Sequence, residues 1–351
     1  MATTDEVRSV LRCEPAPAGG RRPLFLPAVY EHKAFFLDDT PSRVSRDADL
    51  LARAVLAEYA ALQPDALTIG LDVYNLEAEA AGCRVTFYEG DDTSIPGIRP
   101  GDHVVDASTD FASRAVPNPL RDGRMPVNIE ATRRVVAELG GDVWIRGALS
   151  GPFSLAISLM GAEDFFLCCW DNPDASKRLL EYCTAIIKEF GGAYIDAGAE
   201  VILFDSQASP DLLSPKMYRE YVLPFTRSIV EHFGQLGVRD VPLIIGGNTT
   251  RIIDELLETG ANNLLCDFTA DWPAWSARCR EAGRSVRRNM SPQFVASATP
   301  DEVFETAQQV VAEGADLPGF IVGTAVVPYG TPTENLLAVR RACTADHGVN
   351  G

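Results

Sequence analysis

The stretch from 241 to 267 constrains the fold more than any other part of this chain. An apolar run at 242–245 ends in two glycines, and the polar residues after them offer N-cap oxygens to a helix that begins near Arg251. A second apolar run follows at 263–266 and ends in Asp267. Strand, helix and strand in this order form one βαβ unit, which implies a parallel sheet.

The same alternation of apolar runs and helical patterns extends over the whole chain, whose 351 residues are enough for one large barrel or two medium domains. The absence of GxGxxG and GxxxxGK[ST] motifs disfavours the open nucleotide-binding sheets. We therefore predict a single (β/α)8 TIM-type barrel over 21–345, preceded by an N-terminal segment (1–20) and followed by a short tail (346–351). Its expected strands are 24–30, 65–73, 142–148, 200–205, 242–245, 263–266, 285–289 and 319–322.

Two segments of the pattern, 83–125 and 216–234, give more specific expectations. The segment 83–125 breaks the alternation, so we expect an excursion after the second strand, either a hairpin or a lid. Residues 216–234 are expected to form one helix.

Charge and cysteine usage limit the partners. The formal net charge is −18, which argues against nucleic acid and anionic membranes and leaves a small-molecule substrate. None of the 8 cysteines forms a CxxC pair, and no apolar run is long enough to cross a membrane. These features predict a cytoplasmic protein with reduced thiols. A homodimer is left open.

Polar side chains follow the predicted strand ends, which form the edge that carries the chemistry in parallel barrels. His32 is a candidate general acid or base because imidazole titrates near neutral pH, and it could also bind a metal together with nearby carboxylates. The full set of candidate catalytic residues is Glu31, His32, Asp72 and Asp205. For the carboxylates and for Asn248, a role as helix caps is an open alternative.

Candidate substrate-binding residues share a position near predicted strand ends or in the adjoining loops. Arg288 and Arg146 could hold an anionic group, and Arg146 is expected either at an exposed strand end or buried against an anion or a carboxylate. The full set is Asn75, Arg146, Gln207, Asn248, Arg288, Asn289 and Tyr329.

Five segments resemble the uroporphyrinogen decarboxylase (URO-D) superfamily. They are YNLEAEAAGC at 74–83, GALSGPFSLAISLMG at 147–161, SQASPDLLSPKMYREYVLPF at 206–225, GGNTTRIIDELLETGANNLLCD at 246–267 and VPYGTPTENL at 327–336. The resemblance implies a distorted (β/α)8 barrel with a cleft at the C-terminal ends of its strands. It also implies one of two activities, decarboxylation of porphyrinogens or methyl transfer with a methyl-corrinoid protein.

This chain departs from both catalytic signatures. The resemblance places the zinc ligands of the methyltransferases at Ile244, Gly246 and about Ala325, and none of these side chains can bind zinc. The Arg-Gln-Ala-Gly-Arg segment of the decarboxylases is replaced by VYEHKAFF. The resemblance aligns Asp72 with the aspartate that bonds pyrrole N–H groups in that branch.

These observations favour a methyltransferase that moves a methyl group between a small substrate and a corrinoid on a separate protein, without the usual zinc site. One alternative is a decarboxylase or lyase that acts on a carboxylated substrate, and another is a non-catalytic barrel that binds a tetrapyrrole or a partner. We expect His32→Ala and Asp72→Ala to abolish turnover with the fold intact, and Asn248→Ala mainly to weaken substrate binding.

Overall fold

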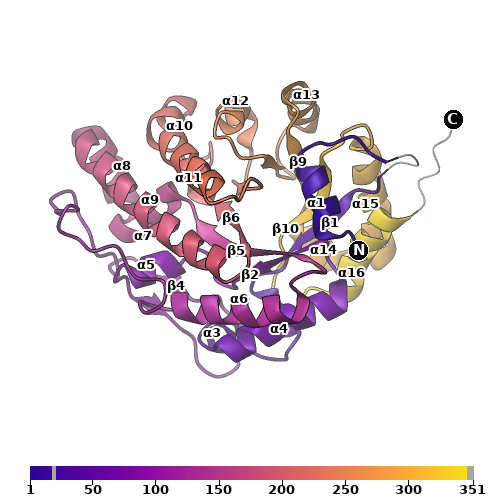
Figure 1. Cartoon of the computed structure of the whole chain (residues 1–351), viewed down its shortest axis with the longest axis horizontal. Coiled ribbons are helices and arrows are strands. Elements are labelled where there is room, and N and C mark those ends of the chain that lie inside the picture. The colour runs from indigo at the N-terminus through magenta and orange to yellow at the C-terminus, as the bar shows by residue number, and fades with distance from the viewer. Residues whose placement is uncertain (18–20, 346–351) are drawn as a thin grey trace.

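Eight parallel strands form a nearly closed barrel with helices around it in a computed structural model that describes residues 1–17 and 21–345 (Figure 1). The sheet order is β1-β10-β9-β8-β7-β6-β5-β2, as the βαβ pattern predicts. The predicted TIM-type barrel is thus confirmed. Its strands are Leu24–Ala28 (β1), Ala66–Ile69 (β2), Trp144–Ser150 (β5), Glu200–Phe204 (β6), Pro242–Ile244 (β7), Asn263–Cys266 (β8), Ser285–Met290 (β9) and Phe320–Val326 (β10).

Helices cover the outside of this sheet, with 3-10 turns at Ser206–Ala208 (η1) and Thr249–Ile252 (η2). The α-helices before β6 are Thr4–Leu11 (α1), His32–Phe35 (α2), Pro41–Val44 (α3), Ala48–Leu62 (α4), Leu76–Ala80 (α5), Met125–Leu139 (α6), Pro152–Met160 (α7), Ala162–Asp171 (α8) and Pro173–Asp196 (α9). Those after β6 are Pro215–Tyr221 (α10), Leu223–Gln235 (α11), Ile253–Leu257 (α12), Trp272–Ala282 (α13), Pro292–Ser297 (α14), Pro300–Glu313 (α15) and Thr333–Thr344 (α16).

The predicted excursion after the second strand is present. It follows Leu76–Ala80 (α5) and contains a small antiparallel hairpin of Val85–Thr86 (β3) and Gly97–Ile98 (β4) before the chain returns in α6. The Asn75 side chain fastens this excursion to the barrel, since its amide donates to the Pro96 carbonyl at 2.7 Å.

The single helix expected at 216–234 is wrong. Two helices, α10 and α11, occupy this region and meet at Val222, whose φ of −119° departs from helical geometry. Pro224 explains the break, because in a continuous helix its ring would clash with the Glu220 carbonyl and it has no N–H to donate to that carbonyl.

The N-terminal end of the barrel is closed by α1, whose buried face packs against side chains of the strands. This contact forms a separate apolar cluster of Ala2, Val7, Val10, Leu11, Leu24, Leu26, Ala66, Trp144 and Ile321. The opposite end of the barrel is therefore the one open to ligands.

The barrel interior near the C-terminal ends of the strands holds a second small apolar cluster. It consists of Ala28, Tyr30, Val73, Ala148, Ile202, Phe204, Ile244 and Leu265, with Val326 packed against it. Within the described residues, no single helix meets the length and hydropathy of a membrane span, although α7 and α8 do so jointly as a pair bent by 106°.

Candidate active site

Polar groups from four neighbouring strands meet at the C-terminal end of the barrel, which we call the interior polar cluster: Gly247, Asp267, Arg287, Asn289 and Thr324. Arg287 donates from Nε to Asn289 Oδ1 and from a terminal nitrogen to the Thr324 carbonyl, both at 2.9 Å. Asp267 accepts from the Gly247 N–H at 2.9 Å, and the Asn289 amide reaches its other oxygen at 3.5 Å. All three of the charged and amide side chains in this cluster are buried.

Arg288 does not belong to this cluster. Its side chain forms an ion pair with Glu313 and lies 4.8 Å from the centre of the Trp272 ring, so it faces the helices outside the barrel. Successive side chains of a strand point to opposite faces, so Arg287 and Asn289 point inward and Arg288 points outward. Arg287, rather than the predicted Arg288, is therefore the arginine of β9 that points into the barrel.

Arg146 is buried inside the barrel, and no carboxylate among the described residues forms an ion pair with it. One terminal nitrogen donates to Thr68 Oγ1 at 2.8 Å, the guanidinium lies 4.9 Å from the Trp144 ring centre, and Nε has no partner. Burial lowers the pKa of Arg146 to about 10, which still leaves it charged at neutral pH. Of the two alternatives expected for Arg146, an exposed strand end is therefore excluded, and the buried side chain has no carboxylate partner among the described residues.

His32 lies at the start of α2, directly after β1, and is completely buried. Its ring stacks on Phe35 at 5.1 Å and meets Phe36 edge-on at 4.9 Å, and neither ring nitrogen has a hydrogen-bond partner in the described structure. Burial lowers the pKa of His32 to about 4, with a further contribution from the Lys33 charge, so the imidazole is neutral at pH 7. Tyr329 joins this aromatic group, since its ring lies 5.5 Å from that of Phe35.

Glu31 precedes His32 and remains partly exposed. One of its carboxylate oxygens, Oε2, is buried and has no hydrogen-bond partner within the described residues. Burial raises the pKa of Glu31 above its ordinary value, although its backbone N–H and the Lys33 charge act against this. A partly exposed carboxylate with a free oxygen and a raised pKa can accept a proton from a bound ligand.

Asp72 is taken up by a buried ion pair. Both of its oxygens accept from the Arg124 guanidinium, at 3.0 and 2.7 Å, and Arg124 also bonds Glu79 at 2.6 Å. The Asn75 amide, already bonded to the excursion, lies 3.5 Å from Asp72. These contacts give Asp72 and Asn75 structural partners and leave no free carboxylate oxygen on Asp72 for catalysis or metal binding.

Asp205 is completely buried at the end of β6, against the N-terminus of α7. It accepts from the Ser154 N–H and from Ser154 Oγ, each at 2.7 Å, while its second oxygen has no partner among the described residues. A side chain at Gly151 would overlap this carboxylate, so the glycine makes the close approach possible. Burial raises the pKa of Asp205 to about 6.

Two of the predicted amide ligands, Asn248 and Gln207, are exposed. Asn248 accepts from the Thr250 N–H at 3.2 Å, which is the helix-cap role left open by the sequence. Gln207 has its backbone N–H bonded to Ser154 Oγ at 3.1 Å and its side chain in solvent.

Glu77 is a titratable group that the sequence prediction missed. It is fully buried in α5 and accepts from the Ser150 N–H at 2.7 Å and from Ser150 Oγ at 3.0 Å. Burial raises its pKa to about 7. The one sequence signal was an acidic residue on the apolar side of a short helix after the second strand.

The residues at the family's zinc positions do not fit zinc. Ile244, Gly246 and Ala325 have no donor atom in their side chains, and a Cβ at Gly246 would lie 3.5 Å from an Asp267 oxygen. Across residues 1–17 and 21–345, no group of three or more His, Cys, Asp or Glu side chains could hold a metal ion. Asp267 alone beside these positions is too few ligands for the zinc site that the resemblance implies.

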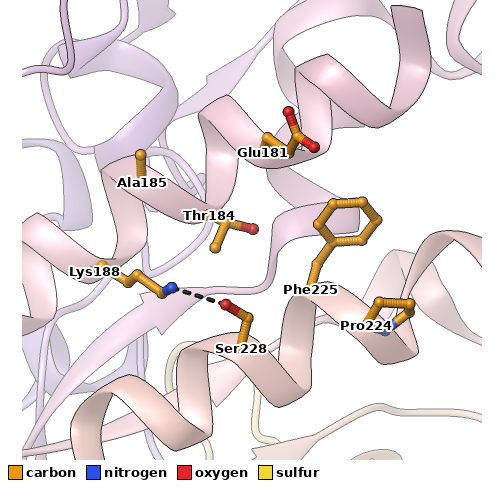
Figure 2. Close-up of a pocket in the computed structure, with 7 residues that line it drawn as sticks. All are labelled: Glu181, Thr184, Ala185, Lys188, Pro224, Phe225 and Ser228. Carbon is orange, nitrogen blue, oxygen red and sulfur yellow. Dashed lines mark hydrogen bonds between the residues drawn. The ribbon is translucent and has the colours of Figure 1, made fainter. Parts of the chain in front are cut away.

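A separate groove of about 410 Å³ lies on the outer layer between α9 and α11 (Figure 2). Lys188 on α9 reaches across it and donates to Ser228 Oγ at 2.8 Å. Its other lining residues are Glu181, Thr184, Ala185, Pro224 and Phe225. None of the predicted site residues lines this groove.

Comparison with known proteins places the chain in a family. Residues 25–345 match the family model described as uroporphyrinogen decarboxylase (URO-D). The chain belongs to this family. This URO-D protein is also similar in structure to a methyltransferase from Methanosarcina mazei, with a TM-score of 0.85 at 21% identity over 98% of both chains.

Curated relatives of this URO-D protein include both activities of the family. It is 27% identical to a methylated-thiol–coenzyme M methyltransferase of Methanosarcina mazei, over 85% of this chain and 77% of the relative. It is 28% identical to a methylcobamide:CoM methyltransferase of Methanosarcina acetivorans, over 83% and 82%. It is also 27% identical to a uroporphyrinogen decarboxylase of Koribacter versatilis, over 84% and 82%.

Proposed function

We propose that this URO-D protein is a methyltransferase that moves a methyl group between a small substrate and a corrinoid carried by a separate protein, without a zinc ion at the family position. The observation that carries the proposal is the similarity to methylcobamide:CoM methyltransferases over more than four fifths of this chain. The absence of donor atoms at Ile244, Gly246 and Ala325 supports the zinc-free part.

Without zinc, the chain itself must remove the proton from a methyl acceptor such as a thiol. Of the four predicted catalytic residues, Asp72 is bound to Arg124 and both His32 and Asp205 are completely buried. Glu31 follows β1 at the ligand-binding end and is the one residue of the four that is partly exposed. We assign it the role of general base: its carboxylate takes the acceptor's proton, and the acceptor then forms its bond to the methyl group that leaves the corrinoid.

The rim of the barrel supports a protein as the methyl carrier. Large apolar side chains are exposed after four different strands: Phe35 (39%), Tyr74 (36%), Leu212 (49%) and Phe268 (44%). Since the C-terminal ends of parallel barrel strands lie at one end, these side chains surround the same opening. Exposed apolar groups gathered around a cleft are typical of surfaces that bind another protein.

The second candidate function is decarboxylation of a carboxylated substrate. It is favoured by the similarity to uroporphyrinogen decarboxylases and by the buried arginines of the barrel, which could hold substrate carboxylates.

The two functions can be separated in one set of assays. Purified protein is treated with a chelator, dialysed and mixed with methylcobalamin and a panel of small thiols, and loss of the methylcobalamin absorbance is followed. We expect demethylation that survives chelation and is not increased by added zinc, and a loss of about 100-fold or more in kcat for Glu31→Gln.

Two controls sharpen this assay. The exposed Glu163→Gln should retain the wild-type rate. Zinc-dependent recovery after chelation would contradict the zinc-free proposal. Release of CO2 from carboxylated substrates without any methyl transfer would support the decarboxylase instead.

A further inference from the structure

Lys188, in the groove between α9 and α11, has no carboxylate to pair with among the described residues. Its ammonium reaches across the groove and donates to the Ser228 hydroxyl at 2.8 Å. Lys177 on the same helix, by contrast, forms an ion pair with Glu220 of α10 at 3.1 Å. Burial lowers the pKa of Lys188, and the charge of Glu231 only partly offsets this effect. An ammonium has three N–H donors, so Lys188 still has donors free for an anionic group.

Glu181 lies at the other end of the same groove (Figure 2). It is exposed and is in no ion pair within residues 1–17 and 21–345. Glu181 precedes Lys188 by about two turns of α9, so both side chains lie on one face of the helix, about 10 Å apart along its axis. The groove therefore presents a carboxylate at one end and an ammonium at the other, and neither has a counter-ion from the described chain.

Between these charged ends, the groove offers apolar surface and one unused hydroxyl. Its apolar lining comes from Ala185 of α9 and from Pro224 and Phe225 of α11. Thr184 is only 7% exposed, its Oγ1 has no hydrogen-bond partner within the described structure, and Figure 2 shows its side chain directed between the two helices. A buried hydroxyl without a partner is costly, so Thr184 can bond a ligand that enters the groove one helical turn from Lys188.

We propose that this groove is a binding site for a small ω-amino acid, a zwitterion whose amino and carboxylate ends are joined by a short alkyl chain. The amino group pairs with Glu181, the carboxylate takes the free donors of Lys188, and the chain lies against Phe225. Hydrogen bonds of about 3 Å at each end of a span of about 10 Å fit a ligand with charged groups about 5–8 Å apart, which is a chain of about four to six carbons. The groove volume of about 410 Å³ is within the range of small-molecule sites.

The two charges of the groove favour a zwitterion over a simple ion. A plain anion would satisfy Lys188 but would lie near the carboxylate of Glu181, on a chain with a net charge of −18. A plain cation would satisfy Glu181 but would meet the ammonium of Lys188. A ligand with both charges gives each side chain its partner, and its alkyl part is removed from water against Phe225.

The groove is separate from the opening of the barrel. No candidate active-site residue lines it, so this inference does not depend on the proposed methyl transfer. A ligand in the groove touches both α9 and α11, which already pack closely where Gly191 meets the Phe233 ring. Because a ligand that binds only the folded state stabilises it, binding should appear as a higher midpoint of thermal unfolding.

The test uses the full chain, with ε-aminocaproate as the probe. Thermal unfolding and calorimetric titration are recorded at neutral pH and constant ionic strength. Caproate and hexylamine serve as analogues that each lack one charge, and glycine serves as a zwitterion that is too short. We expect ε-aminocaproate to raise the midpoint by about 2 °C or more near saturation. Caproate, hexylamine and glycine should each bind at least about tenfold more weakly.

Variants assign each end of the ligand to one side chain. Lys188→Met and Glu181→Gln should each weaken the binding of ε-aminocaproate at least about tenfold. Glu181→Gln should also lose the preference for this zwitterion over caproate, and Lys188→Met should lose the preference over hexylamine. Lys216→Met and Glu189→Gln, at exposed positions outside the groove, should keep the wild-type affinity.

Both groove variants should fold, because neither side chain is fully buried and neither is in an ion pair in the described structure. Three results would overturn the site: no stabilisation of the wild type by ε-aminocaproate, equal affinity of the wild type for caproate or hexylamine, or wild-type affinity in Lys188→Met or Glu181→Gln. Binding as expected in a protein without methyl-transfer activity would leave the site standing, since the groove and the candidate active site share no residue.

Discussion

At the scale of single residues, Asp72 shows how a buried partner decides the role of a carboxylate. The sequence placed it at a strand end and predicted that Asp72→Ala would leave the fold intact. In the structure it is 2% exposed and holds Arg124 with both oxygens. Removing one partner of a buried pair leaves the other charge uncompensated, which is costly.

We therefore expect Asp72→Ala to lower the free energy of unfolding by about 3 kcal/mol, the remaining Glu79 contact limiting the loss. Urea unfolding followed by circular dichroism measures this. Asp316→Ala, which removes an exposed partner of Arg280, should change stability by less than about 0.5 kcal/mol. Wild-type stability with abolished turnover in Asp72→Ala would restore the catalytic role.

Glu77 gives a prediction about pH. Its pKa is raised from 4.5 to about 7 in the folded chain, mainly by burial, so the native state binds this proton more tightly than the unfolded state. Its stabilising contribution is complete below about pH 4.5 and is lost as pH rises through about 7. Glu77→Gln keeps the shape without the charge and should flatten this part of the stability profile by about 3 kcal/mol.

The measurement is the unfolding free energy of the wild type and of Glu77→Gln at several pH values between about 4 and 8. Glu130→Gln, at a half-exposed surface position, is the matched control and should follow the wild type. Parallel profiles for the wild type and Glu77→Gln would show that Glu77 titrates normally.

At the scale of elements, α9 packs closely against α11 at Gly191, whereas the adjacent Gly192 has open space around it. A Cβ at Gly191 would overlap the Phe233 ring of α11, whereas a Cβ at Gly192 would meet nothing within 4 Å. Close packing leaves no space for even one added methyl group at the first position.

Gly191→Ala is expected to destabilise the protein by about 1–3 kcal/mol through overpacking. Gly192→Ala should be neutral or stabilise it by up to about 1 kcal/mol, because alanine favours the helix. The midpoints of thermal unfolding of the two variants, measured side by side, check this. Equal midpoints would mean that α9 and α11 are not packed as described.

At the scale of the whole molecule, the barrel depends on contacts at the two ends of its sheet, β1 and β2. Asp65, just before β2, accepts from the Phe25 N–H of β1 at 2.8 Å and from the Ala2 N–H at 2.7 Å, and it is paired with Arg22. Burial alone would raise the pKa of Asp65, but the hydrogen bonds and charge of Arg22 outweigh it and lower the pKa. One buried carboxylate thus ties together β1, β2 and the N-terminal segment.

Asp65→Asn should lower the free energy of unfolding by about 2–4 kcal/mol at pH 7, since it removes the charge but not the shape. Because the folded pKa is lowered, the wild-type advantage should shrink as pH falls below about 4. Urea unfolding of both proteins at pH 7 and under acidic conditions measures this. An unchanged difference at low pH would contradict the role of the Arg22 pair.

The sequence by itself determined the order of strands and helices, the barrel and the excursion. Apolar runs with polar ends are local patterns, and chain connectivity then allows few parallel arrangements. It also determined that Ile244, Gly246 and Ala325 cannot supply zinc ligands, because donor chemistry is a property of the residue type. Pro224 was a sequence signal for the break between α10 and α11. The apolar pattern around it favoured one continuous helix, and the prediction followed that pattern.

Only the tertiary structure decided which polar residues face the barrel. Arg287 and Arg288 are adjacent and chemically identical, yet one points inward and the other outward, because register fixes the face of every strand residue. Asp72 and Asp205 both follow predicted strands, so the sequence does not distinguish them. In the structure, Asp72 forms an ion pair with Arg124, whereas Asp205 is buried and accepts hydrogen bonds from Ser154. Burial and pairing depend on contacts that close in three dimensions, so local sequence patterns cannot supply them.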